Sequence, residues 1–237
     1  MPQNQHDSTR RDFLRHSATG AAAVALLASM EDFYSVSAQT NERTTTMAKI
    51  KGTKTEQNLL KAFAGESQAR NRYTMFAHKA SEEGYEHIAA AFLETADQER
   101  VHAQQFFLYL ETGEGLEITA TFPAGKVGTT EENLLAAATG EKEEWDKIYP
   151  EFANIAREEG FVDIFRSFTA IAVAEKQHEK RYRGFLEQLK AGNLFKRANV
   201  TWRCRNCGFT ATGESAPGVC AACKVPQAWF EILAENW

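Results

Sequence analysis

Two copies of one short motif constrain this chain most strongly, because each lies within a long amphipathic run. The motifs are Glu99-x-x-His102 and Glu175-x-x-His178, and residues three apart share one face of an α-helix. A carboxylate and an imidazole on one face can bind a metal ion together. A single pair would be weak support, since helix surfaces are rich in glutamate. Two pairs on two long helices predict a helical bundle with a metal site inside it.

Four long helical patterns follow one another along the chain, over residues 53–82, 85–111, 129–159 and 161–190. Capping boxes mark the first and third starts, at Thr53-x-x-Glu56 and Thr129-x-x-Glu132. Pro150 should kink or divide the third helix, because proline removes a backbone donor and clashes with the preceding turn.

The connection between the second and third helices, residues 112–128, predicts the topology. It contains four glycines and one proline, so we expect a loop. Because about 17 residues exceed a normal helix–helix connection, it should be a crossover rather than a tight hairpin. Four long helices with one long crossover describe an all-α, ferritin-like four-helix bundle.

Acidic residues on the first and third helices complete a set of metal ligands. Bundles that hold two metal ions use a Glu from each of two helices and a Glu-x-x-His from each of the other two. The predicted ligands are Glu66, Glu99, His102, Glu141, Glu144, Glu175 and His178. Small or apolar residues surround Glu66 and Glu175, and an unpaired carboxylate in such a setting would be costly. The pattern therefore predicts a pair of metal ions, and oxygen-rich ligands with imidazoles suit iron.

Two tyrosines lie seven residues after predicted ligands, at nearly the same helical angle. Tyr73 follows Glu66 in this way, and Tyr182 follows Glu175. Each hydroxyl could form a hydrogen bond near the metal site, or each ring could simply pack in the core. The residues alone leave both readings open.

The four cysteines of the chain form two C-x-x-C knuckles near the C-terminus, at Cys204, Cys207, Cys220 and Cys223. This spacing favours a tetrathiolate metal site over two disulfides, but it does not separate iron from zinc. Zinc would make the segment a structural or binding module. The oxygen-reactive site predicted in the bundle favours iron. Aromatic residues around the knuckles could form a dry shell that tunes the potential, or simply the core of a small domain.

The first 46 residues have the features of an export signal. Arg10 and Arg11 form a twin-arginine element, an apolar stretch follows over 18–30, and small residues at 36–38 offer a cleavage site. The apolar stretch is shorter than the roughly 20 residues that a membrane-spanning helix needs, so we expect no stable membrane span. The leader predicts a periplasmic or other extracytoplasmic location; a disordered amphipathic tail is the alternative. Translation from Met47 would instead leave the protein in the cytoplasm.

Taken together, the motifs resemble those of the rubrerythrin family. The resemblance extends from about residue 49 to 237 and is carried by segments 64–73, 94–102, 149–152, 174–181 and 202–208. It implies a ferritin-like di-iron domain over 47–192 and a rubredoxin-like domain over 193–237. It also implies a non-haem di-iron peroxidase that reduces hydrogen peroxide to water in oxidative-stress defence. Two iron ions would lie in the bundle and one in the four-cysteine site, which would pass electrons to the pair.

The same resemblance implies roles for individual residues. The seven predicted ligands match the di-iron ligands of the family, and Glu144 and His102 match a pair that exchanges on one iron with oxidation state. Tyr73 and Tyr149 match tyrosines that surround the ligands. Members commonly form homodimers in which one subunit's rubredoxin iron lies near the partner's di-iron site, so we expect a homodimer.

Two departures from the family leave questions open. The leader is unlike cytoplasmic members, so the donor could be an NAD(P)H-linked reductase or another electron-donor protein. Ala221 stands where proline is usual in the second knuckle, which could loosen the loop and shift the potential. Two other functions remain as alternatives: a ferroxidase or iron-handling protein, and a zinc-ribbon interaction protein with an inactive bundle. A net charge of −5 without a basic block argues against a nucleic-acid partner.

Overall fold

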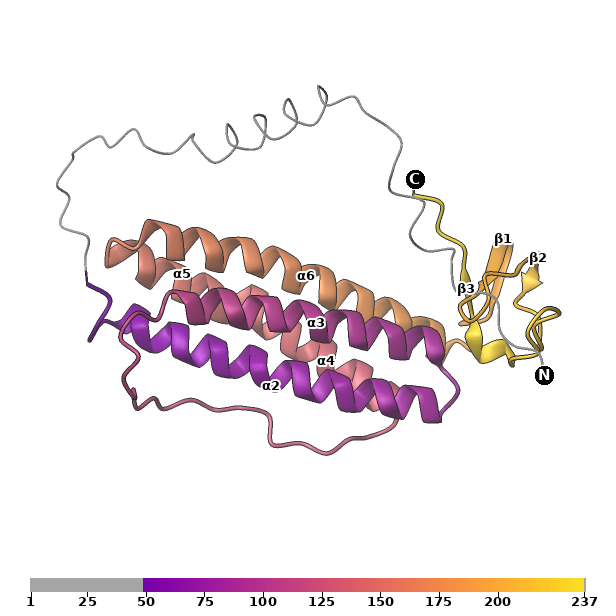
Figure 1. Ribbon diagram of the computed structural model, residues 1–237, viewed down its shortest axis with the longest axis horizontal. Coiled ribbons are helices and arrows are strands. Elements are labelled where there is room, and N and C mark those ends of the chain that lie inside the picture. Colours follow the sequence, from indigo (N-terminus) through magenta and orange to yellow (C-terminus); the bar gives the residue numbers. More distant parts are fainter. Residues whose placement is uncertain (1–48, 237) are drawn as a thin grey trace, which may run out of the picture. The chain divides into compact units, whose positions relative to one another are not determined.

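The computed structural model describes residues 49–236, so the predicted leader and Met47 lie outside the described residues. The bundle consists of α2 (Lys54–Glu82), α3 (Glu86–Leu108), α4 (Thr130–Glu143), the π-helical turn η1 (Glu144–Ile148), α5 (Tyr149–Glu158) and α6 (Val162–Lys190). Figure 1 shows these helices packed lengthwise, with the crossover running along the outside of α2. The structure therefore has the predicted ferritin-like architecture. None of the helices in this part of the chain combines the length and the apolar character that crossing a membrane requires.

The α2–α3 connection and the α5–α6 connection each turn at a glycine. Gly84 lies in the turn between α2 and α3 with φ +81°, and the amide of Tyr85 donates to the carbonyl of Ala80 at 2.8 Å. Gly160 lies in the turn between α5 and α6 with φ +87°, and the amide of Phe161 donates to the carbonyl of Ala156 at 2.8 Å. Glycine adopts this left-handed conformation without a steric penalty, so both helices end sharply.

The two predicted capping boxes differ in the structure. At Thr129 the box is complete, since the Thr129 hydroxyl accepts from the Glu132 amide and the Glu132 carboxylate accepts from the Thr129 amide. At Thr53 the hydroxyl accepts from the Glu56 amide, but Glu56 accepts from the amide of Gly52 instead. Both arrangements satisfy free amides at a helix start.

The expected interruption of the third helix takes the form of a π-helical turn. Pro150 lies in the first turn of α5, where a missing amide hydrogen is tolerated. Immediately before it, the amide of Tyr149 bonds to the carbonyl of Glu144, five residues earlier. The wider turn accommodates the proline and changes the helical angle of the residues that follow.

Two aromatic clusters fill the bundle, one on each side of its middle. The first includes Tyr73, Phe92 and Tyr182, with ring centroids 5.0 to 6.0 Å apart. The second includes Phe106 and Phe168, whose centroids are 4.7 Å apart. Between them lies a group of buried charged side chains. The clusters keep the surroundings of these charges dry.

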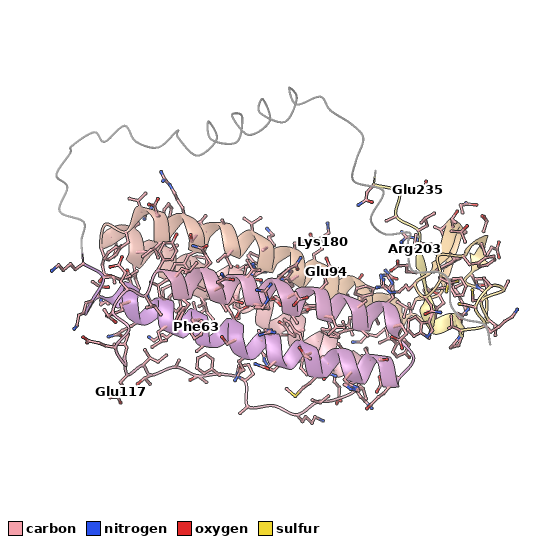
Figure 2. The ribbon with its side chains drawn as sticks, in the orientation of Figure 1. Phe63, Glu94, Glu117, Lys180, Arg203 and Glu235 are labelled. Atoms are coloured by element: carbon pink, nitrogen blue, oxygen red, sulfur yellow. The ribbon has the colours of Figure 1, made fainter. Side chains whose placement is uncertain are left out.

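The C-terminal segment forms a small antiparallel sheet in the order β2-β1-β3. The strands are β1 (Lys196–Cys204), β2 (Thr210–Ser215) and β3 (Phe230–Ile232), with the 3-10 turn η2 (Gln227–Trp229) before the last. Its core contains Trp202 and Phe230, both fully buried. In Figure 2 the labelled Arg203 lies on this sheet, while Glu94 and Lys180 lie on α3 and α6 of the bundle.

Candidate metal centres

The bundle brings six of the seven predicted ligands into two overlapping groups. One contains Glu66, Glu99, His102 and Glu175; the other contains Glu99, Glu141, Glu175 and His178. In each group the ligand atoms lie within 4.8 Å of one another. Glu99 and Glu175 belong to both groups, so each can offer one oxygen to each of two metal ions. This is the arrangement of a bridged dimetal site.

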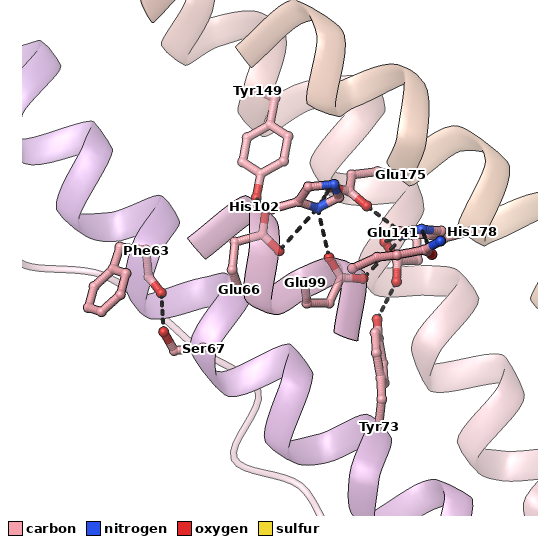
Figure 3. A network of polar contacts seen from close by, with 11 residues as sticks. Phe63, Glu66, Ser67, Tyr73, Glu99, His102, Glu141, Tyr149, Glu175 and His178 are labelled. Carbon is pink, nitrogen blue, oxygen red and sulfur yellow. Dashed lines mark hydrogen bonds and ion pairs between the residues drawn. The ribbon is translucent and has the colours of Figure 1, made fainter. Parts of the chain in front are cut away.

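Both histidines direct Nδ1 into the cluster, as Figure 3 shows. His178 Nδ1 lies 2.8 Å from Glu175 Oε2 and 3.2 Å from Glu99 Oε1. His102 Nδ1 lies 2.9 Å from oxygens of both Glu99 and Glu175. Since each histidine comes from the same helix as one of these glutamates, the i, i+3 spacing sets part of the geometry. The packing of α3 against α6 sets the distance from each histidine to the glutamate on the other helix.

The cluster fits a pair of cations. Glu66, Glu141 and Glu175 are fully buried, and Glu99 is 1% exposed. Several ligand atoms of the cluster have no hydrogen-bond partner among residues 49–236: Oε2 of Glu66, Oε1 of Glu99, Oε2 of Glu141, both oxygens of Glu175, and Nδ1 of His178. Glu175 Oε2 and His178 Nδ1 are thus close but not aligned for a hydrogen bond, which is expected when both atoms point at a third atom. Uncompensated buried carboxylates cost several kcal/mol each, and metal ions would remove that cost.

The charges of the cluster shift the pKa values of its members. Burial, followed by the charges of Glu175 and Glu99, raises the pKa of Glu66 well above its usual range. Burial also raises the pKa of Glu141. For His178, burial acts to lower the pKa, but close polar contacts with the surrounding carboxylates outweigh it and raise the pKa to about 12. Without metal, the site therefore holds protons that bound cations would have to displace.

Glu144 is the predicted ligand that lies outside both groups. It is in the π-helical turn, partly exposed, and lines a cavity beneath the crossover. Burial and the charge of Glu66 raise its pKa. His102, its expected exchange partner, lies within the cluster. Exchange between the two stays a prediction.

Two tyrosines approach the cluster from opposite sides (Figure 3). The Tyr73 hydroxyl donates to Oε1 of Glu141 at 2.5 Å, and the Tyr149 hydroxyl donates to Oε1 of Glu66. The seven-residue spacing placed Tyr73 beside Glu66 of its own helix, but its partner belongs to α4. The hydroxyl of Tyr182 has no hydrogen-bond partner within the described residues, so for this ring the packing interpretation holds.

Sequence reasoning missed Gln98. Its Oε1 lies 2.9 Å from Nε2 of His178, on the side of the ring away from the cluster. Such a contact fixes the orientation of a ligating imidazole. No spacing rule connects a residue of α3 with a histidine of α6, so the sequence carried no signal for it.

The four cysteines form a second centre in the small domain. The sulfurs of Cys204 and Cys223 are 3.8 Å apart, and those of Cys207 and Cys220 are 3.6 Å apart. A disulfide needs about 2.0 Å, whereas a tetrahedron with metal–sulfur bonds of about 2.3 Å has edges of about 3.8 Å. The sulfur–sulfur distances therefore fit a tetrathiolate metal site and exclude two disulfides in this structure.

The two knuckles have the same backbone geometry. The amide of Gly208 donates to the carbonyl of Cys204 at 2.9 Å, and that of Lys224 donates to Cys220 at 3.0 Å. The second knuckle thus closes like the first with alanine at position 221. A hydrogen bond from Asn206, and then one from the amide of Val225, lower the pKa of Cys223 to about 6, which favours the thiolate that a metal needs.

Comparisons with known proteins agree with both centres. A family model described as rubrerythrin matches residues 57–186, and one described as the rubrerythrin rubredoxin-like domain matches 202–231. A rubrerythrin of Porphyromonas gingivalis is 55% identical over 189 residues, covering 79% of this chain and 94% of the relative. A rubrerythrin of Nitratidesulfovibrio vulgaris is 53% identical over 192 residues, covering 81% of this chain and all of the relative.

Solved structures show the same fold. Fully reduced, all-ferrous nigerythrin superposes with a TM-score of 0.53 and 30% identity, covering 81% of this chain and 96% of that one. A bacterioferritin of Desulfovibrio desulfuricans, with a di-iron site in different catalytic states, has a TM-score of 0.51 and 25% identity over 58% of this chain and 81% of that one.

Proposed function

Since this chain belongs to the rubrerythrin family, with a di-iron carboxylate–histidine site and a rubredoxin-like iron site, we propose that it is a peroxidase that reduces hydrogen peroxide to water. One observation carries the proposal. Glu99 and Glu175 are shared by two ligand groups, and a buried phenol is hydrogen-bonded to a ligand of each group. The site can thus hold two metal ions and two O–H donors around one small space.

The reaction consumes two electrons and two protons for each peroxide, breaks the O–O bond and yields two waters. Two bound iron ions would supply the electrons and stabilise negative charge on oxygen. The protein holds protons nearby at the hydroxyls of Tyr73 and Tyr149. Burial, followed by the charges of Glu141 and Glu66 respectively, raises the pKa of each phenol, so both remain protonated at neutral pH. Each is held by a ligand carboxylate and can donate toward an oxygen in the site.

The four-cysteine iron is proposed to return the electrons one at a time. Cys207 is exposed and Cys223 is partly exposed, so this centre is accessible to a redox partner at the surface. That partner would be an NAD(P)H-linked reductase or another electron-donor protein. In a homodimer, the small domain of one subunit would serve the dimetal site of the other.

The location of the protein is proposed from its leader. The twin-arginine element at Arg10 and Arg11 would direct export of the folded chain, with iron loaded before export. A product starting at Met47 would remain in the cytoplasm and have access to soluble pyridine nucleotide. Fractionation of cells that express the full chain, with antibody detection of the processed size, tests the two possibilities.

Rapid mixing tests the peroxidase function. Fully reduced protein is mixed anaerobically with hydrogen peroxide, and the ferric–thiolate absorption of the four-cysteine site is followed. Fast reoxidation that is lost in Glu175→Ala and His178→Ala would support peroxide reduction coupled to the four-cysteine site. Slow reoxidation that is insensitive to both changes would contradict it.

The alternatives give different results in simple assays. A ferroxidase would form ferric mineral in excess ferrous iron and would not need the four cysteines. An interaction protein would contain zinc in the cysteine site and no iron in the bundle, which metal analysis would detect.

A further inference from the structure

Two cavities lie near the ligand cluster, one lined by two of its ligands and one lined by Tyr149, whose hydroxyl is bonded to a ligand. One, of about 750 Å³, is lined by His102 and His178. The other, of about 430 Å³, lies between α2, the π-helical turn and residues 119–123 of the crossover, with Glu144 and Tyr149 in its wall; we call it the crossover cavity. We propose that the crossover cavity is the route by which a small hydroperoxide reaches the dimetal site, and that Phe122 limits its size. This inference rests on the peroxidase function proposed above.

Two residues that line the crossover cavity each carry a buried polar atom without a hydrogen-bond partner in the described chain. Gln68 Oε1 and Arg72 Nε are buried, and neither has a hydrogen-bond partner within the described chain. Buried polar atoms normally have partners, so an acceptor and a donor left free in one cavity wall point to a small polar guest. A hydroperoxide, which both donates and accepts hydrogen bonds, matches this pair.

Two polar groups in the wall of the cavity beside the histidines are paired. In the cavity beside the histidines, Gln98 Oε1 contacts His178 Nε2 at 2.9 Å, and Arg181 donates to Glu94 at 2.7 Å. The imidazoles of His102 and His178 are stacked, with centroids 6.0 Å apart and an interplanar angle of 27°. A molecule arriving there meets the outer edges of two ligating rings.

A molecule in the crossover cavity meets different groups. Glu144 belongs to neither ligand group, so its carboxyl does not close the cluster on this side. Tyr149 is next to it and donates its hydroxyl proton to Glu66, a ligand of the cluster. The crossover cavity therefore ends at a carboxyl outside the ligand groups and at an O–H donor that is bonded to a metal ligand.

Phe122 is the most buried of the crossover residues in the cavity wall. Among the five crossover residues that line the cavity, it is the one that is partly buried. Its ring lies against α2 at Gly65, where an added Cβ would be 3.9 Å from the Phe122 Cε1 atom. This is an ordinary van der Waals distance, so the ring packs directly on the helix surface. A large ring at this place would exclude bulky hydroperoxides.

A matched pair of leucine substitutions tests the route. Gly140 lines the crossover cavity and Gly184 lines the other, and an added Cβ at either glycine meets no atom within 4 Å. Iron-loaded, reduced Gly140→Leu and Gly184→Leu would be mixed with nitric oxide, and its rate of binding to the dimetal site measured. We expect several-fold slower binding in Gly140→Leu and an unchanged rate in Gly184→Leu.

This binding rate does not depend on turnover, so it separates the route from the peroxidase function. An unchanged rate in Gly140→Leu, or equal slowing in both variants, would overturn the proposed route. Nitric oxide binding could be slowed in Gly140→Leu alone while the parent protein does not reduce peroxide. In that case the peroxidase function is wrong, and the crossover cavity remains the route by which small molecules reach the metal site.

Phe122→Ala tests whether the ring limits the size of the hydroperoxide that enters. The substitution lies in the crossover, outside the helices. We expect the ratio of reoxidation rates with tert-butyl hydroperoxide and hydrogen peroxide to rise by about tenfold, since small changes of fit in a pocket have effects of this order. Val127→Ala, on the same crossover but outside the cavity lining, is the control and should keep the parent ratio. An unchanged ratio in Phe122→Ala would overturn the role of the ring.

Discussion

The hydroxyl of Tyr73 on α2 donates a 2.5 Å hydrogen bond to Oε1 of Glu141 on α4, a residue 68 positions further along the chain. This bond leaves Oε2 of Glu141 free to face the metal ligands. It links two helices of the bundle through a ligand carboxylate. Tyr149 and Glu66 form the corresponding link at the other end of the cluster.

Removing the hydroxyl of Tyr73 should slow turnover. In Tyr73→Phe, Glu141 loses its hydrogen bond and the site loses a proton donor, so we expect peroxide turnover to fall by roughly tenfold to a hundredfold. Rapid-mixing kinetics measures this. Tyr182→Phe is the matched control, because Tyr182 belongs to the same aromatic cluster and its hydroxyl has no hydrogen-bond partner in the part of the chain that the structure describes. Equal rates in the two variants would show that the Tyr73 hydroxyl is not used.

Glu175 should be required for loading of both metal ions in the bundle. It belongs to both ligand groups, so Glu175→Ala removes an oxygen from each. We expect loss of the bundle iron and of turnover, while the ferric–thiolate colour of the four-cysteine site is retained. Metal analysis and the visible spectrum measure this. Glu187→Ala, an exposed glutamate of the same helix, should behave like the parent protein. Full activity of Glu175→Ala would refute the assignment.

Iron binding to the bundle should release protons. The pKa of His178 is raised to about 12 in the metal-free site, so this imidazole holds a proton at neutral pH that a metal must displace, and the pKa of Glu66 is raised as well. The affinity for ferrous iron should therefore rise between about pH 6 and 8. Anaerobic titration calorimetry in buffers of different ionisation enthalpy gives the number of protons released. An affinity that does not vary with pH would show that no proton is displaced from the site.

The cap at the start of α4 should contribute to stability and not to chemistry. Thr129→Ala removes the hydroxyl that accepts from the Glu132 amide, and we expect the free energy of unfolding to fall by about 1 kcal/mol. Urea unfolding measures it, with peroxide turnover unchanged. Thr139→Ala is a control within the same helix, because its exposed hydroxyl bonds only to the carbonyl of Leu135. An equal loss in both variants would mean that capping is not the cause.

The ligand types of both centres, carboxylate with imidazole in one and thiolate in the other, could be predicted from the sequence alone. The i, i+3 spacing of Glu99 and His102 places both on one face of a single helix, and C-x-x-C spacing fixes a knuckle through local backbone geometry. Helix starts at Thr129 and the interruption near Pro150 are likewise local effects. Such features depend on a few neighbouring residues, so a spacing rule can predict them.

Tertiary structure alone decided which helix each side chain meets. Spacing fixed the angle of Tyr73 around α2, but the rotation of α2 against α4 brought it to Glu141 rather than Glu66. The π-helical turn left Glu144 outside the ligand groups, and the packing of α3 on α6 brought Gln98 to His178. The path of the crossover over Gly65 was also not predictable from its glycines. These contacts depend on how large aromatic side chains fit between helices, and that fit involves residues far apart in the chain.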